Sequence, residues 1–293
     1  MYIDCFKGAK LGDRMSLAFL TEAMKFYKLK SNRAIQVLFI AVFLLNAFML
    51  IVPMGDSDLS PFFTWLTQQQ LDTGENFLRT SPHIEPVLSV GNLLYLLKDV
   101  LINSINLSFI YLYGSIMLGD YLEKDVKDAV KTYFKKLPLI LLFALLLVIP
   151  YFVSISFLLI PYYVLLVRVA FTPYYELEGK HKITKAFSES WYQTSGITLT
   201  MVVSIFFQQL LVNMISTLVS IFMAPAAIST VMLTALINTL NAIITGRLFT
   251  LYYIYFVKVN PRGRFRVQEN VQDFIENFKK IRSQVSGEEF KQA

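Results

Sequence analysis

Residues 137–171 read LPLILLFALLLVIPYFVSISFLLIPYYVLLVRVAF, a nearly continuous apolar run in which Ser154 and Ser156 lie between two prolines. A membrane-spanning helix needs about 20 mostly apolar residues, so the run is too long for one ordinary span. Proline and weakly polar residues mark the point at which a helix ends most readily. We therefore interpret the run as two helices, about 137–154 and 156–173, joined by a tight turn.

Apolar stretches on both sides of this run are each long enough for one further span. They cover about 34–54, 94–119, 196–223 and 228–257. Together with the divided run they predict an all-α fold, a polytopic membrane helical bundle with about six transmembrane helices. If the central run formed one long tilted helix instead, the chain would cross five times and its C-terminus would lie on the other side.

The composition supports a membrane as the solvent for most of the chain. Hydrophobic residues make up 55% of the 293 residues, charged residues make up 16%, and the mean hydropathy is +0.51. Soluble domains have typical values of about 45–50% and about 25%. A water-soluble fold of this composition would leave much apolar surface wet, whereas a bilayer covers it.

Basic residues gather in alternate connecting segments, which predicts the orientation. Arg79 is the only Lys or Arg of residues 55–92, which hold several acidic side chains. Lys and Arg are frequent in 1–33, 120–136, 172–195 and 258–293. The positive-inside rule places these four segments in the cytoplasm, and only an even number of spans satisfies all four. We therefore expect a multi-pass membrane protein with both termini in the cytoplasm.

These segments divide the chain into an amphipathic cytoplasmic N-terminal segment, a transmembrane domain and a basic cytoplasmic tail. Their ranges are 1–33, 34–257 and 258–293. Within the first segment, one helical face carries Met15, Phe19, Ala23 and Phe26. This pattern is typical of an amphipathic helix that lies on the inner leaflet.

Polar residues follow one face of three predicted spans at helical spacing. They are Asp99, Asn103 and Asn106 in the second span, Gln209, Asn213, Ser216 and Ser220 in the fifth, and Thr234, Asn238, Asn241 and Thr245 in the sixth. Polar groups in hydrocarbon usually face other helices or water. The stripes therefore indicate either a polar cavity or pathway, or hydrogen-bonded packing between helices. For Asp99, a wet position at the outer headgroup level is a further possibility.

Arg168 and Arg247 are also unfavourable within a span. Both lie in spans that run toward the cytoplasm, at a depth from which an arginine reaches the inner headgroups. Arg247 is alternatively buried in the bundle, because a long apolar and aromatic stretch follows it. A buried arginine needs an anionic partner, and the expected one is Glu176 or Glu178, just beyond the fourth span.

The sequence contains no recognisable catalytic motif. It has no Walker A phosphate loop, no H-E-x-x-H and no G-x-S-x-G. Its single cysteine and two histidines are too scattered for a metal cluster, so we expect no metal and no cofactor. The net charge of +6 follows the connecting segments, which favours topology and anionic lipid over nucleic acid as its explanation.

One region resembles a known superfamily. From Pro161 the chain reads PYYVLLVRVAFTPYYELEGKHKITKAFSESWYQTSG, and residues 247–258 read RLFTLYYIYFVK. An apolar span with a late arginine, a proline, a short acidic turn and an A-x-x-x-S-W helix is similar to bacterial membrane proteins that include YciC-like proteins. The superfamily also includes the membrane domain joined to some glycerophosphodiester phosphodiesterases. The matching positions, within about 161–257, are Arg168, Pro173, Glu176, Ala186, Ser190 and Trp191.

The resemblance implies a six-helix, multi-pass protein of the bacterial inner (plasma) membrane. These residues contain no counterpart of the soluble phosphodiesterase domain, so that activity is not implied. Glu176, Ser190 and Trp191 are candidates for the cytoplasmic interface. The A-x-x-x-S-W helix is amphipathic, so we expect it along the inner leaflet with Phe187 and Trp191 toward lipid.

Three functions fit these observations. The first is a non-enzymatic transport-related or scaffolding subunit, specifically a permease subunit of an ATP-driven exporter, whose helices at 122–136 and 182–193 dock a cytoplasmic nucleotide-binding subunit or another membrane protein. The second is an envelope-stress, lipid-homeostasis or peptide-immunity factor that binds lipid or a hydrophobic peptide between helices. The third is a membrane enzyme that acts on lipid headgroups, with Asp99 or Glu176 as base. Catalysis usually needs a convergent group of titratable residues, which favours the first two.

Overall fold

The computed structural model describes residues 17–27, 29–60, 64, 89–154, 159–179, 182–222 and 228–259. Regular structure within these ranges is helical throughout, which confirms the predicted all-α class. The elements are α2 (Asn32–Ile51), α4 (Val90–Tyr121), α5 (Val126–Leu146), α6 (Val148–Ser154), α7 (Ile160–Val169), α8 (Thr172–Leu177), α9 (Ile183–Thr194), α10 (Thr198–Phe222), α11 (Ile228–Tyr253) and the π-helical turn η2 (Ile254–Val259). The predicted N-terminal segment up to residue 16, and the predicted tail from residue 260, lie outside the described residues.

Five helical stretches in these ranges are long and apolar enough to cross a membrane. They are Asn32–Ile51, Val90–Tyr121, Val126–Tyr151, Thr198–Val219 and Ile228–Lys258. A membrane-embedded helical bundle is therefore confirmed as the class of this protein. The third stretch begins earlier than expected, because the charged residues from Val126 onward continue into the apolar run as one helix.

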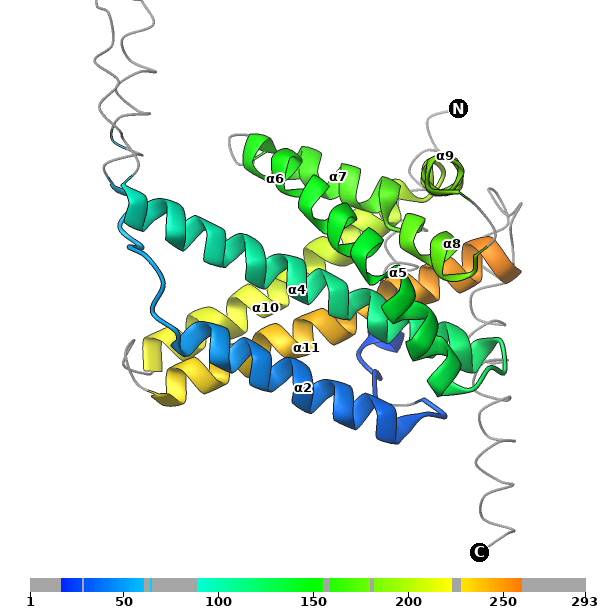
Figure 1. Cartoon of the computed structure of the whole chain (residues 1–293), viewed down its shortest axis with the longest axis horizontal. Helices are drawn as coiled ribbons and strands as arrows, with labels where there is room; N and C mark the ends of the chain where they lie inside the picture. Colours follow the sequence, from blue (N-terminus) through cyan, green and yellow to red (C-terminus); the bar gives the residue numbers. More distant parts are fainter. Residues whose placement is uncertain are drawn as a thin grey trace, which may run out of the picture.

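The chain reverses within the apolar run, as the sequence indicates. α6 ends at Ser154 and α7 begins at Ile160. Leu159 adopts a left-handed φ of 60°, and its N–H donates to the carbonyl oxygen of Ser154 at 2.9 Å. The rings of Tyr151 and Tyr162 then meet edge to face, with centroids 5.3 Å apart, so the two helices form a hairpin (Figure 1).

The returning arm of this hairpin is not the single span predicted for 156–173. It consists of the 10-residue α7, a break at Ala170 and Phe171, and the 6-residue α8. At 1.5 Å per residue α7 is about 15 Å long, roughly half the thickness of a hydrocarbon core. A sixth crossing therefore stays a prediction.

Three polar contacts set α2 and α4 side by side in antiparallel register. The backbone N–H of Ser31 donates to Asp120 at 3.2 Å near one end. Asn46 and Asn106 pair in the middle, and Lys98 Nζ donates to the carbonyl oxygen of Val52 at 2.7 Å. The part of α4 before Lys98 therefore extends beyond the end of α2 (Figure 1).

The two ends of the bundle differ in charge. Residues 17–27, α8, α9 and η2 gather at the end where α4 stops and α5 begins (Figure 1). We call this the basic end, because the exposed lysines of α5 and α9 lie there, and the opposite end the far end. The ends of α2 and of the α6–α7 hairpin that face away from it lie at the far end.

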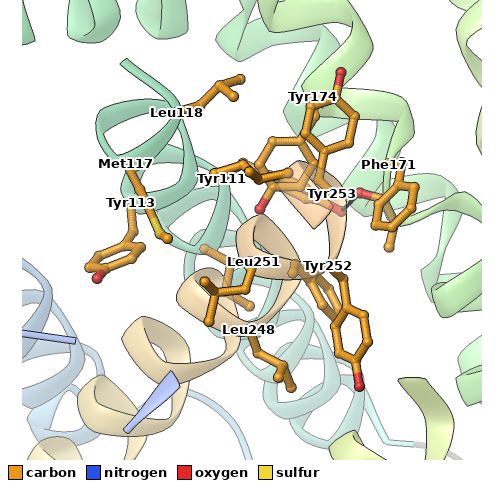
Figure 2. Close-up of a cluster of buried hydrophobic side chains, with 14 of the residues drawn as sticks. Tyr111, Tyr113, Met117, Leu118, Phe171, Tyr174, Leu248, Leu251, Tyr252 and Tyr253 are labelled. Carbon is orange, nitrogen blue, oxygen red and sulfur yellow. Dashed lines mark hydrogen bonds between the residues drawn. The ribbon is translucent and has the colours of Figure 1, made fainter. Parts of the chain in front are cut away.

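The core is centred where α4 crosses α11 (Figure 2). Gly114 and Gly246 permit the approach, since an added Cβ at Gly246 would lie 2.7 Å from the carbonyl oxygen of Ile110. At Gly114 the added atom would lie 2.6 Å from the Tyr174 ring. The rings of Tyr174 and Tyr253 stack there at 5.0 Å, so the space left by the glycines is filled by tyrosine.

Residues 17–23 are helical, but their apolar face does not meet lipid as the sequence predicts. Phe19 is 1% exposed and stacks on Tyr252 with ring centroids 4.4 Å apart. Ala23 is fully buried and Phe26 is partly buried against the same core. The amphipathic pattern was correctly recognised, but α11 and η2 cover this face instead of the inner leaflet.

Candidate functional site

Arg247 is fully buried and pairs with Glu22. A guanidinium nitrogen lies 3.2 Å from a Glu22 carboxylate oxygen, and Nε donates to the Glu22 backbone oxygen at 2.9 Å. Tyr113 adds a hydrogen bond to the carbonyl oxygen of Phe26 at 2.8 Å. The snorkelling alternative for Arg247 is therefore wrong, and so is the expected partner. The pair fixes residues 17–27 in the bundle.

The expected partner glutamates of α8 pair with lysines instead. Lys136 of α5 donates to Glu176 at 3.0 Å, and Lys258 of η2 pairs with Glu178. Glu176 is only 4% exposed, so the predicted interface residue is buried. The two ion pairs hold α8 between α5 and η2. Burial, together with the nearby charges of Glu189 and Glu178, raises the pKa of Tyr175 on the same helix above its ordinary value.

Ser190 explains why the chain can break between α7 and α8 in a buried place. Its Oγ donates to the carbonyl oxygen of Arg168 at 2.8 Å and accepts from the N–H of Phe171 at 3.1 Å. Thr194 Oγ1 also donates to the Arg168 carbonyl oxygen, at 3.2 Å. Backbone groups at a buried helix end need such partners. Ser190 thus supplies hydrogen bonds to the backbone groups that the break leaves without helical partners. Its side chain is buried and is not available as a surface contact.

Arg168 lies beside α9 without an anionic partner among the described residues. Its NH1 donates to the Trp191 carbonyl oxygen at 3.2 Å, and its guanidinium carbon lies 5.2 Å from the centroid of the Trp191 ring. Trp191 and Phe187 stack and are 44% and 45% exposed. Both rings therefore lie on the exposed side of α9, and their contact with lipid stays a prediction.

Asn106 of the predicted stripes bonds across helices. Asn106 and Asn46 exchange two amide hydrogen bonds, at 3.1 and 3.2 Å, and Asn46 also donates to Thr239 at 3.3 Å. This network joins α2, α4 and α11. The sequence analysis missed Asn46, although an amide within an otherwise apolar span was a usable signal.

Asn241 belongs to a second network. Its partner on α10 is Gln208, which is adjacent to the predicted Gln209. Gln208 Nε2 lies 2.7 Å from Asn241 Oδ1 and 2.6 Å from Thr245 Oγ1. Gln209, the residue predicted, points away from this contact and is partly exposed. One residue is a rotation of about 100° on a helix, which explains the error.

The remaining candidates do not join these networks. Asn103 is exposed, and within the described part of the chain it donates to Asp99 alone, at 3.3 Å. The register with α2 places both residues near the end of the paired region. Asn238 is partly buried, and Asn213 is exposed on α10. Asn103, Asn213, Asn241 and Arg247 thus have separate surroundings, which supports helix packing over a single polar cavity. Among the described residues, no group of His, Cys, Asp and Glu could hold a metal ion.

Comparisons with known proteins leave the resemblance in residues 161–257 as a prediction. No protein-family model matches this chain, and neither a curated protein nor a solved structure is significantly similar to it.

Proposed function

We propose that this chain is a non-enzymatic scaffolding or transport-related subunit of the bacterial inner membrane, with both termini in the cytoplasm. The observation that carries the proposal is the use of amides within the spans. Asn46 pairs with Asn106, and Gln208 pairs with Asn241, so these groups connect helices. Such contacts contribute about 0.6–2 kcal/mol each. Polar groups used in this way hold the bundle in one arrangement, as a scaffold requires.

The basic end supplies the docking surface of this proposal. The first turns of α5 pack against the end of α4, where Ser115 donates to the carbonyl oxygen of Ala129 at 3.0 Å. Lys127 and Lys131 of α5 are exposed there, as is Lys124 just before the helix. Lys136, further along α5, is tied to α8 by its ion pair with Glu176. A docked subunit would therefore contact a helix that is fixed to the rest of the bundle. The partner that we propose is a cytoplasmic nucleotide-binding subunit of an ATP-driven exporter.

Purification of the tagged chain in mild detergent tests this function. We expect a nucleotide-binding subunit to co-purify in a fixed ratio, and the double variant Lys127→Glu/Lys131→Glu to lose it. Lys30→Glu is the matched control, because Lys30 is also exposed near the basic end but outside α5. Loss of the partner in neither or in both variants would contradict docking on α5.

Binding of anionic lipid is the second candidate, and Arg168 favours it. Its guanidinium is held against Trp191, beside the exposed apolar side of α9. Lys185 of α9 is exposed, and so is Lys182 immediately before the helix. Basic residues near an aromatic edge attract anionic headgroups. Mass spectrometry of lipid retained on the purified protein should show less anionic lipid for Arg168→Gln than for Arg33→Gln, and equal retention would count against this candidate.

A further inference from the structure

The polar stripe predicted for the fifth span faces outward from the bundle. Asn213 is exposed, and Gln209 and Ser216 are partly exposed. The buried side of α10 instead carries Ser204 and Gln208, which bond to α11. The Asn213 side chain makes no hydrogen bond within the described part of the chain. A carboxamide thus lies on a surface that the bundle presents to lipid.

The position of Asn213 along α10 keeps it away from the headgroups. The helix continues to Phe222, and the side chains beyond Asn213 include Met214, Leu218 and Ile221, which are 56%, 53% and 66% exposed. At 1.5 Å per residue this apolar extension is about 13 Å long. The carboxamide of asparagine is too short to reach water across that distance. Such a group in hydrocarbon normally finds a protein partner.

Exposed amides elsewhere on the described spans lie close to the basic end, as Asn32 and Gln36 of α2 do, or have a partner, as Asn103 of α4 has in Asp99 at 3.3 Å. The exposed large side chains of α2 are Val37, Ile40, Leu44, Phe48 and Ile51. Those of α5 and α6 beyond the lysines are Leu142, Leu145, Leu146 and Ile149. The contrast sets α10 apart as the face that is suited to another helix.

The chemistry of asparagine identifies that other helix. A carboxamide has donors and an acceptor, so two asparagines can exchange two hydrogen bonds. Asn46 and Asn106 do this within the bundle, at 3.1 and 3.2 Å. Two copies of this chain cross the membrane in the same sense, and a two-fold axis along the membrane normal brings equal positions together.

We propose that two copies associate through α10, with Asn213 of one copy paired to Asn213 of the other. Gln209 and Ser216 lie about one turn on either side of the pair. Gln209 adds a second amide, and the small Ser216 permits close approach of the helices. The interface lies on the side wall of the bundle, so it is independent of docking at the basic end.

Disulfide cross-linking in native membranes tests this interface. Cys5→Ser removes the only native cysteine. Single cysteines then replace Phe206, which is two helical turns from Asn213 on the same side, or Leu218, which points about 140° away. Both positions are exposed, at 59% and 53%. We expect at least tenfold more cross-linked dimer from Phe206→Cys than from Leu218→Cys.

A second pair of variants isolates the amide. In the Phe206→Cys background, Asn213→Leu should remove at least nine-tenths of the dimer, whereas Asn213→Gln should retain most of it. An unfolding temperature equal to that of the parent chain, measured in dilute detergent where copies are apart, shows that the Asn213→Leu chain still folds. Equal cross-linking at the two cysteine positions, a dimer that survives Asn213→Leu, or a cross-link to a different protein would each overturn the proposal.

Discussion

Arg247 reaches Glu22 across 225 positions of sequence, and the resulting ion pair holds residues 17–27 inside the bundle. The guanidinium is fully buried, and it contacts both the side chain and the backbone of Glu22. Removal of one partner from a buried ion pair typically destabilises by about 3–5 kcal/mol. Without Arg247 the Glu22 carboxylate keeps its ion pair with Lys25, at 2.8 Å, but the Glu22 backbone oxygen loses its buried donor.

We therefore expect Arg247→Leu to lower the thermal stability of the purified protein strongly, measured by unfolding in detergent. The control is Arg33→Leu, because Arg33 is exposed at the start of α2. Replacement of both partners, in Arg247→Met/Glu22→Leu, should recover part of the loss. Equal stability of Arg247→Leu and Arg33→Leu would contradict the buried pair.

Ser190→Ala should destabilise the break between α7 and α8. The change leaves the Phe171 N–H without its acceptor and removes a donor from the Arg168 carbonyl oxygen. An unsatisfied buried group costs about 1–3 kcal/mol. Ser188→Ala on the same helix is the matched control, because Ser188 is exposed. Thermal unfolding of the two variants in one detergent measures the difference, and similar melting temperatures would refute the role of Ser190.

Gln208→Leu and Gln209→Leu separate the interior from the exterior of α10. Gln208 contacts Asn241 and Thr245, whereas Gln209 is partly exposed. We expect Gln208→Leu to cost about 0.6–2 kcal/mol, the range of interhelical hydrogen bonds in membranes, and Gln209→Leu to cost less. Unfolding in dilute detergent, where copies are apart, is the measurement. A larger effect at Gln209 would show that the side of α10 carrying Gln209, and not the side carrying Gln208, faces the bundle interior.

Trp191 offers a direct measure of how deep α9 lies. The chain has two tryptophans, so Trp65→Phe leaves Trp191 as the only one. Because Trp191 and Phe187 form the exposed side of α9, we expect brominated lipids to quench its fluorescence most when bromine is near the headgroups. Weak quenching at every depth would mean that water or protein covers this side. Phe187→Ser should reduce the quenching if the two rings insert together.

The amphipathic and apolar patterns were sufficient to predict the helices, but not what covers each face. Phe19 and Ala23 were correctly placed on one face of a helix, yet that face packs on Tyr252 instead of lipid. Periodicity reports that a face is apolar and cannot distinguish lipid from a neighbouring helix, since both are apolar. For the same reason, the sequence analysis expected the polar face of the fifth span, which includes Asn213, to point into the bundle. In the structure Asn213 is on the outside of the bundle.

Long-range pairing was the part of the candidate site that the sequence could not supply. Arg247 was expected near Glu176, because both lie close to the same predicted membrane surface. The actual partner, Glu22, belongs to a segment that the sequence assigned to the lipid surface. The charge of Arg247 and its predicted depth in the membrane limit its partner to a glutamate near the same membrane surface. Which of these glutamates it contacts depends on which segments of the chain pack together. Ser190 was identified only through the resemblance, and its role required the geometry of the break.

The α6–α7 hairpin decides whether the chain crosses the membrane six times or, if the hairpin enters and leaves on one side, four times. α7 has 10 residues, yet Ile160 at its start lies on the opposite side of the bundle from the basic α9 that follows. If the hairpin crosses fully, a cysteine at Ile160 in the Cys5→Ser background should react with a membrane-impermeant maleimide from outside intact cells. Asp58→Cys at the far end should react likewise, and Lys131→Cys on α5 should react only after permeabilisation. Protection of Ile160→Cys, with the other two as expected, would make the hairpin re-entrant. In either case α5 begins and α9 lies on the same side of the membrane, so both outcomes are compatible with the predicted cytoplasmic C-terminus. Labelling of the hairpin therefore tests the number of spans separately from the predicted orientation.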